Sequence, residues 1–205
     1  MINIGYFLME FSRINFFKKF PNLKPFVGKT YSRYKILIVG ESHFLRQDFK
    51  NQISDDFYKG DESLLGRGVY ENILSLDTTY ECSKDKLHNI HRNLSGALKE
   101  VGLDYQNIAY YNFFLKPAVN GMSIIPTDLD RDVANCVFAE IIAILQPKLI
   151  VFVSRKSFDH FKKTTKVNIV PHPTCSWWNR KSRKYQNRTG REKFICLMKH
   201  SLNQQ

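Results

Sequence analysis

The chain has 205 residues, of which 43% are apolar and 14% are aromatic, and its formal net charge is +12 at pH 7. This composition excludes an intrinsically disordered chain and is sufficient for a single domain with its own core. The sequence has no run of about 18 apolar residues and no basic leader with a secretory cleavage site, so we expect no membrane span and a cytoplasmic location.

The positive charge is concentrated at the two ends of the chain. Residues 1–35 carry seven Lys or Arg against one Glu, and residues 176–205 carry eight against one. Such a density of basic side chains suits a nucleic-acid backbone, whose counterions are released on contact. A solvated basic surface that only keeps the protein soluble is the alternative. The densest cluster comprises Arg180, Lys181, Arg183, Lys184, Arg188, Arg191 and Lys193.

The cysteines and histidines do not indicate a metal site. The four cysteines, Cys82, Cys136, Cys175 and Cys196, stand far apart and form no C-x-x-C pair. Reduced thiols are therefore expected. The histidines at 88, 91, 160 and 200 also lack the spacing of metal ligands. We expect neither a metal nor a cofactor.

The first part of the chain predicts a helix and then a buried strand. Apolar residues recur at helical spacing over residues 6–20, and Pro21 ends the pattern. A loop over residues 25–34 leads to the aliphatic run 35–40, which predicts a strand covered on both faces, as in parallel sheets. Gly40 then permits a sharp turn and a close approach by a ligand. The next residues are polar: Glu41, Ser42 and His43.

The remaining segments alternate between helical and strand patterns. Residues 45–62 form a polar excursion over the strand ends. The expected helices cover residues 64–76, 87–101, 133–145, 154–161 and 190–202. Three of them have a recognisable end: Gly102 follows the second, a capping box from Thr127 to Asp130 precedes the third, and Ser154 is the N-cap of the fourth. The expected strands cover residues 107–115, with Pro117 ending the strand, 149–153 and 167–170.

This alternation predicts an α/β fold, a three-layer α/β/α sandwich with a central four-stranded parallel sheet. The chain would form one domain, residues 1–205, with an amino-terminal helix and lead-in (1–34) and a basic carboxyl-terminal segment (176–205). Because parallel strands end at one edge, residues 41–43 should lie near Asn112 and His172. Polar groups from three strand ends indicate a site. Each also has a structural reading: Glu41 beside a helix dipole, Asn112 in a turn, His172 as an ordinary loop residue.

Three segments resemble the motifs of the uracil-DNA glycosylase superfamily. Residues 36–44 (ILIVGESHF) are similar to its first motif, an apolar strand followed by G-Q-D-P-Y, G-E-x-P-G or G-M-N-P-G. Residues 108–112 (IAYYN) resemble its second strand, which ends in asparagine, and residues 169–174 (IVPHPT) resemble its H-P-S loop. The resemblance implies the fold of that family and a DNA-repair activity.

The family's chemistry implies a role for each of these residues. A damaged base is flipped out of the duplex, and cleavage of its N-glycosidic bond makes the sugar cationic and the base anionic. A carboxylate near the sugar and a histidine at the leaving oxygen stabilise these charges. The resemblance assigns the carboxylate to Glu41, the histidine to His172 and the base-reading amide to Asn112. His43 would be a second polar group or orient water, and the base-binding site would also include Gly40, Ser42 and Phe44.

The chain departs from the family pattern at several positions. Ser42 stands where the best-known branch has Asp, His43 where most branches have Pro, and Cys175 where Pro is usual. Serine carries no negative charge at neutral pH, so activity on uracil does not follow from the resemblance. Excision of a different base, or no hydrolysis at all, remains an alternative. Trp177 and Trp178 stand where the family has an apolar wedge, although adjacent residues of an extended segment cannot both face one way. The expected DNA-binding residues are Trp177, Trp178, Arg180, Lys181, Arg183 and Lys184.

The leading hypothesis is a monomeric, monofunctional DNA glycosylase that needs no metal or cofactor and acts on a modified base in single- or double-stranded DNA. Two alternatives remain. The first is a nucleic-acid-binding module that keeps the fold but not the catalytic geometry. The second is a hydrolase of a small nucleotide-like substrate, because a fold does not fix a substrate.

Overall fold

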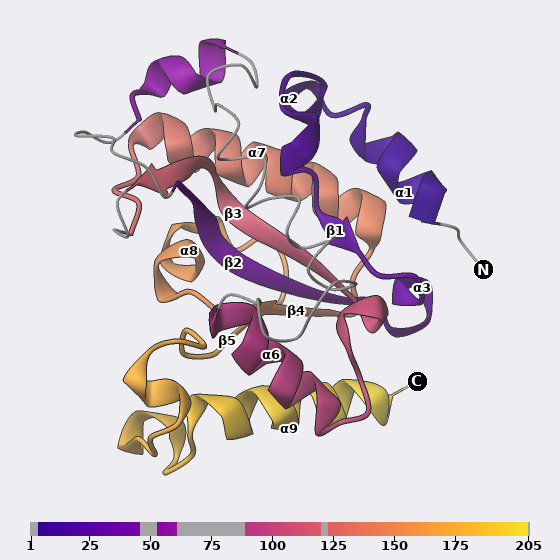
Figure 1. Cartoon of the computed structure of the whole chain (residues 1–205), viewed down its shortest axis with the longest axis vertical. Coiled ribbons are helices and arrows are strands. Elements are labelled where there is room, and N and C mark those ends of the chain that lie inside the picture. The colour runs from indigo at the N-terminus through magenta and orange to yellow at the C-terminus, as the bar shows by residue number, and fades with distance from the viewer. Residues whose placement is uncertain (1–3, 46–52, 61–88, 120–122, 205) are drawn as a thin grey trace.

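The computed structural model describes residues 4–45, 53–60, 89–119 and 123–204, and its centre is a five-stranded mixed sheet (Figure 1). The strand order is β1-β3-β2-β4-β5. Strands β3, β2, β4 and β5 are mutually parallel, and β1 is antiparallel to β3 at the edge. The strands are β1 (Phe26–Val27), β2 (Ile36–Leu45), β3 (Ile108–Val119), β4 (Leu149–Phe152) and β5 (Asn168–Ile169).

Helices cover both faces of this sheet (Figure 1). The α-helices of the described residues are α1 (Ile4–Phe11), α2 (Asn15–Lys19), α3 (Tyr31–Tyr34), α6 (Asn89–Lys99), α7 (Asp128–Leu145), α8 (Arg155–His160) and α9 (Gly190–Leu202). Short 3-10 turns occur at η1 (Pro21–Leu23), η2 (Asp55–Lys59), η4 (Tyr105–Asn107), η5 (Ser176–Trp178) and η6 (Arg183–Tyr185). None of the helices in these described ranges is long and apolar enough to cross a membrane.

Alternate residues of β2 enter two separate cores. Leu37 and Val39 pack with α1 and α7 on one face, where Phe138 lies in the core. Ile36 and Ile38 pack with α6 and α9 on the other face. Because both faces are covered, the strand needs apolar residues at every position, which explains its uninterrupted aliphatic run. The predicted α/β class is confirmed.

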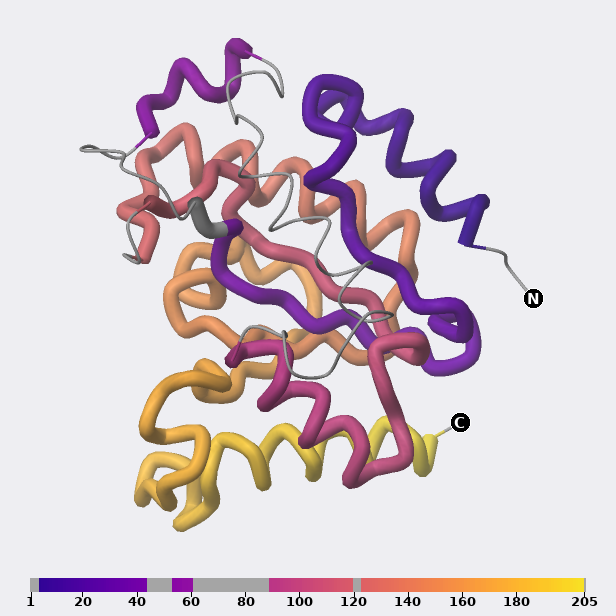
Figure 2. Tube along the Cα trace, viewed as in Figure 1, coloured from indigo at the N-terminus to yellow at the C-terminus, as the bar shows by residue number. Residues whose placement is uncertain are grey.

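The sheet differs from the expected four parallel strands because of its edge. Residues 25–34, expected to be a loop, contain β1 and α3. Figure 2 shows the chain passing from α1 and α2 through β1 and α3 before it enters β2. Strand β3 also continues beyond Pro117, contrary to the prediction. Since β1 pairs only with Ala109 and Tyr110, the missing N–H of Pro117 lies beyond that edge pairing and costs no bond to β1.

The prediction of a single helix over residues 6–20 is wrong. The structure has two helices, α1 and α2, separated at residues 12–14. The Ser12 hydroxyl donates to the carbonyl of Leu8 at 2.8 Å, and Ile14 has extended backbone angles. Phe11 and Phe17 are both buried, so the break lets each short helix present its aromatic residues to the core.

Several helix boundaries agree with the local signals in the sequence. Thr127 and Asp130 form the expected capping box at the start of α7. Ser154 caps α8 by accepting from the N–H of Ser157 at 3.4 Å. Gly102, with φ +72°, follows α6. The helix expected over residues 64–76 and Cys82 lie outside the described residues.

A buried ion pair fastens η2 to the sheet. Lys116 of β3 has a side chain only 4% exposed, and its Nζ lies 2.6 Å from Asp55 and 2.9 Å from Asp130. The hydroxyl of Tyr58 donates to Asp130 at 2.6 Å. The Lys116 hydrogen bond lowers the pKa of Asp55 below its usual value. These contacts hold the polar segment after β2 against β3 and the start of α7.

Candidate functional site

The carboxyl ends of β2 and β3 extend beyond β4. Strand β4 pairs with β2 only from Ile36 to Val39, whereas β3 stays paired with β2 as far as Leu45. Beyond Val39, α8 takes the place of β4, and the hydroxyl of Ser157 donates to the Gly40 carbonyl at 3.0 Å. The backbone at Gly40 therefore lies between β3 and the first turn of α8. The expected turn at Gly40 is wrong: β2 continues to Leu45, so Glu41, Ser42 and His43 lie within the strand, beside β3.

Glu41 is held by hydroxyl groups at both carboxylate oxygens. The Ser154 hydroxyl donates to Oε2 at 2.8 Å, and the Ser123 hydroxyl donates to Oε1. Lys156 of α8 donates to the Ser123 hydroxyl at 2.6 Å and also to the Ile124 carbonyl. The carboxylate is half-buried. Two segments distant from β2 in sequence, residues 123–124 and the start of α8, thus fix the orientation of one acid.

His43 and Asn112 are neighbours, as the sequence predicts. Nδ2 of Asn112 lies 3.3 Å from Nδ1 of His43, and the Tyr110 hydroxyl donates to Oδ1 of Asn112 at 3.3 Å. Asn112 and Tyr110 are buried, and His43 is half-buried. Desolvation by the surrounding protein lowers the pKa of His43 to about 4. The imidazole is therefore uncharged at neutral pH.

His172 is oriented by its own loop. Its Nδ1 accepts the backbone N–H of Thr174 at 3.3 Å and lies 2.8 Å from the Thr174 hydroxyl. A backbone N–H can only donate, so Nδ1 is an acceptor. In the neutral ring the proton is then on Nε2. His172 consequently presents an N–H donor at Nε2.

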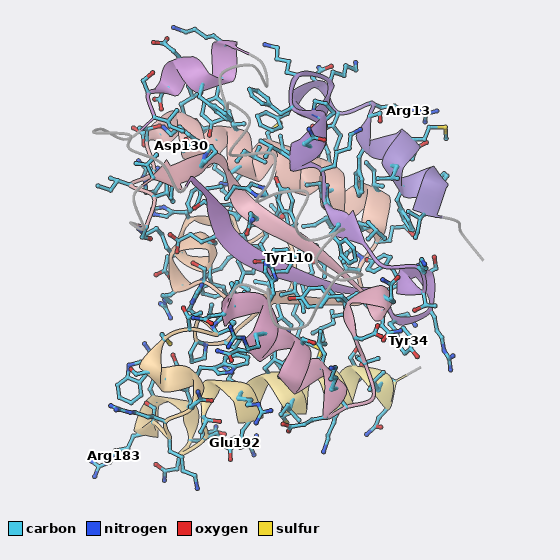
Figure 3. The ribbon with its side chains drawn as sticks, in the orientation of Figure 1. Arg13, Tyr34, Tyr110, Asp130, Arg183 and Glu192 are labelled. Carbon is cyan, nitrogen blue, oxygen red and sulfur yellow. The ribbon has the colours of Figure 1, made fainter. Side chains whose placement is uncertain are left out.

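Helix α6 connects the His172 loop to β3. Nδ2 of Asn93 donates to the Pro173 carbonyl at 2.7 Å, and the ring of His91 lies 5.2 Å from that of Tyr110 in an edge contact. Nδ1 of His91 is also 2.8 Å from the Tyr105 hydroxyl. Figure 3 labels Tyr110 near the middle of the sheet, in front of β2. Helix α6 therefore contacts both the loop after β5 and Tyr110, the neighbour of Asn112 in the first half of β3.

The remaining residues expected at the site have varied positions. The structure pairs His43 with Asn112, whereas serines hold Glu41 and Thr174 holds His172. Ser42 is half-buried opposite Phe114, and Phe44 pairs with Ala118 through the backbone. The sequence did not predict Ser123 or Lys156 at the site, and it indicated Ser154 only as a helix cap.

The two adjacent tryptophans have opposite environments. Trp177 is 50% exposed, whereas Trp178 is 1% exposed and its ring centroid lies 5.8 Å from that of Phe194. The expectation that Trp178 contacts DNA is therefore wrong, because its indole is packed in the core between η5 and α9. Trp177 keeps its indole at the surface, close in sequence to His172.

The basic residues after Trp178 form a compact loop. Ser182 and Arg188 are joined by an antiparallel bridge, and Gln186 and Asn187 have positive φ angles of 56° and 59°. Arg180, Lys181, Arg183 and Lys184 are all exposed. Figure 3 shows Arg183 at the corner of the molecule below α8 and beside the start of α9. We call residues 180–188 the basic loop.

No metal centre is indicated within residues 4–45, 53–60, 89–119 and 123–204, where no three His, Cys, Asp or Glu side chains are grouped to hold an ion. The chemistry of this edge of the sheet is that of the fixed carboxylate of Glu41, the ammonium group of Lys156, the imidazoles of His43 and His172, and several hydroxyls. Compared with known proteins, the chain matches no family model and no curated protein.

Proposed function

We propose that this protein is a uracil-DNA-glycosylase-like DNA-repair hydrolase that cleaves the N-glycosidic bond of a flipped, modified base. The observation that carries the proposal is that the protein itself orients both candidate groups: serine hydroxyls hold the carboxylate of Glu41 in β2, and Thr174 holds the ring of His172 in the loop after β5. The parallel strand order β3-β2-β4-β5 and the helical layers on both faces are compatible with the family's α/β/α sandwich.

The carboxylate suits the cationic side of the reaction. Bond cleavage leaves positive charge on the sugar, and a nearby carboxylate stabilises it or orients the attacking water. The two serine hydroxyls fix both oxygens of Glu41 before substrate arrives. Little reorganisation is then needed during the reaction, which is the condition under which electrostatic stabilisation is most effective.

The histidine suits the anionic side. The departing base carries negative charge on an oxygen, and an N–H donor aimed at that oxygen stabilises it. Thr174 keeps Nδ1 of His172 as an acceptor, so Nε2 carries the proton. The reaction needs water, Glu41 and His172, with no lysine nucleophile and no covalent intermediate.

The surface beside His172 suits DNA. Trp177 provides an exposed indole that can stack on a base or fill the space left by the flipped nucleotide. The basic loop provides cations for the phosphate backbone. Their proximity in sequence to the His172 loop would place backbone contacts and chemistry on one side of the molecule.

A panel of modified-base oligonucleotides tests the proposal. Single- and double-stranded DNA carrying uracil, hypoxanthine or xanthine would be incubated with the protein, and the free base measured by mass spectrometry. We expect release from at least one substrate. DNA binding with no release from any of them would favour the binding module. Hydrolysis of free nucleotides, with no salt-dependent DNA binding, would favour the small-molecule hydrolase and reject our proposal.

A further inference from the structure

The Asn112 side chain is the middle member of a hydrogen-bond chain. The Tyr110 hydroxyl donates to its Oδ1 at 3.3 Å, and its Nδ2 faces Nδ1 of His43, also at 3.3 Å. An amide nitrogen donates and cannot accept, so Nδ1 of His43 must be the acceptor. In a neutral imidazole the other nitrogen, Nε2, then carries the proton.

Gly40 makes room for this chain of contacts. A Cβ at residue 40 would lie 2.3 Å from Oδ1 of Asn112 and 2.3 Å from the Tyr110 hydroxyl, closer than any side chain allows. Glycine therefore lets β2 pass directly against the pair, and the backbone of β2 limits where the Asn112 amide can turn. His43 follows on the same strand, three residues later.

We propose that Asn112 is a positioning residue which, held by Tyr110, keeps His43 in the tautomer with its proton on Nε2, so that His43 offers a hydrogen-bond donor to the substrate. The identity of that substrate rests on the function proposed above. The resemblance assigned Asn112 to reading the base directly. The hydrogen bonds give it another role, with His43 as the group that contacts substrate.

The surroundings of His43 support an uncharged ring. Burial lowers its pKa to about 4, and burial is the cause of the shift. The titratable groups nearest along the strands are turned to other partners: Glu41 of β2 to Ser154 and Ser123, and Lys116 of β3 to Asp55 and Asp130. From α6, His91 faces the ring of Tyr110. A neutral donor at His43 can approach an oxygen of the substrate without adding net charge to the site.

Nitrogen-15 NMR of the histidine rings tests the assignment without any substrate. His43→Gln identifies the His43 signals by their loss. In the unaltered protein at pH 7 we expect protonation at Nε2 only, with titration near pH 4. In Asn112→Asp the carboxylate accepts from Nδ1, so we expect a proton on Nδ1 and a pKa of His43 raised from about 4 to above 6.5.

Tyr110→Phe provides a milder second variant that buries no new charge. Without the hydroxyl, the Asn112 amide loses the bond that orients it, and we expect a mixture of the two His43 tautomers. A proton on Nδ1 of His43 in the unaltered protein, or the same tautomer in all three proteins, would overturn the proposal. Since no base release is measured, this result is independent of whether the protein is a glycosylase.

Discussion

The Ser154 hydroxyl donates to Oε2 of Glu41 across 2.8 Å, joining the cap of α8 to the carboxyl end of β2. The Ser154 hydroxyl oxygen also accepts from the N–H of Ser157 and so caps the start of α8. One side chain thus stabilises an element of the fold and orients the acid of the candidate site. The effect of Ser154 on stability and its effect on the proposed reaction can be measured separately, by comparison with a helix cap that does not contact Glu41.

We expect Ser154→Ala to lower turnover about tenfold, because a carboxylate that loses one of two fixed donors samples unproductive orientations. Its unfolding free energy should also fall by about 1 kcal/mol through the lost cap. Thr189→Ala is the matched control, since Thr189 caps α9 by accepting from the N–H of Glu192 at 3.0 Å. Base release at saturating DNA and urea unfolding measure both effects. Equal turnover in the two variants would contradict the role of Ser154.

Glu41→Gln and His172→Ala should each reduce base release by about 100-fold or more, a typical loss when a group acting directly in the reaction is removed. DNA binding should survive in both, because neither residue belongs to the basic loop. Glu140→Gln on α7 and His200→Ala on α9 change exposed residues of the same types and serve as controls. Unchanged release in both site variants would remove these residues from the mechanism.

Elements with strong local signals could be predicted from the sequence. The capping box before α7 and the aliphatic runs of β2 and β4 depend on neighbouring residues alone. Strand β1 could not be predicted, because two residues become a strand only by pairing with Tyr110 and Ala109, far along the chain. The break between α1 and α2 likewise follows from packing on the core.

The candidate site was predictable only in part. The meeting of His43 with Asn112 follows from the parallel pairing of β2 with β3, although neither strand ends there, since β2 continues to Leu45 and β3 to Val119. The partners of Glu41 do not, since Ser123 and Ser154 are 82 and 113 residues away in sequence. Hydroxyl groups serve equally well as caps, surface residues or ligands of an acid, so their sequence context gives no preference. The opposite environments of Trp177 and Trp178 also depend on how η5 packs against Phe194.

Trp177→Ala should weaken DNA binding about fivefold or more, since stacking on an indole contributes about 1–3 kcal/mol per base. Trp177→Phe should retain most of the affinity, because a phenyl ring still stacks. The fold should be unaffected in both, because the indole is 50% exposed. Fluorescence anisotropy of labelled oligonucleotides measures the affinity. Equal affinity in the alanine variant and the unaltered protein would place the DNA elsewhere.

The double variant Arg183→Ala with Lys184→Ala should reduce the salt dependence of DNA binding. Each lost phosphate contact lowers the slope of log affinity against log salt by about 1. Lys18→Ala with Lys19→Ala removes two exposed charges from α2, at the opposite end of the molecule from η6 in Figure 1. The slope is obtained by repeating the titration at several salt concentrations. If the two double variants give the same slope, only net charge matters and the basic loop is not the contact surface.

The stability of the protein should fall in mild acid because of His43. Its pKa is about 4 in the folded protein against an ordinary value of 6.5, so between these two values the unfolded chain binds a proton that the folded protein does not. Folding therefore loses stability as pH falls through 6.5, by about 2 kcal/mol from this group at pH 5. His43→Gln removes the effect, and its unfolding free energy should decline less between pH 7 and pH 5. His200→Gln, at an exposed position of α9, is the control for loss of an imidazole. Urea unfolding at the two pH values gives the comparison, and an identical decline in all three proteins would show that His43 titrates normally in the fold.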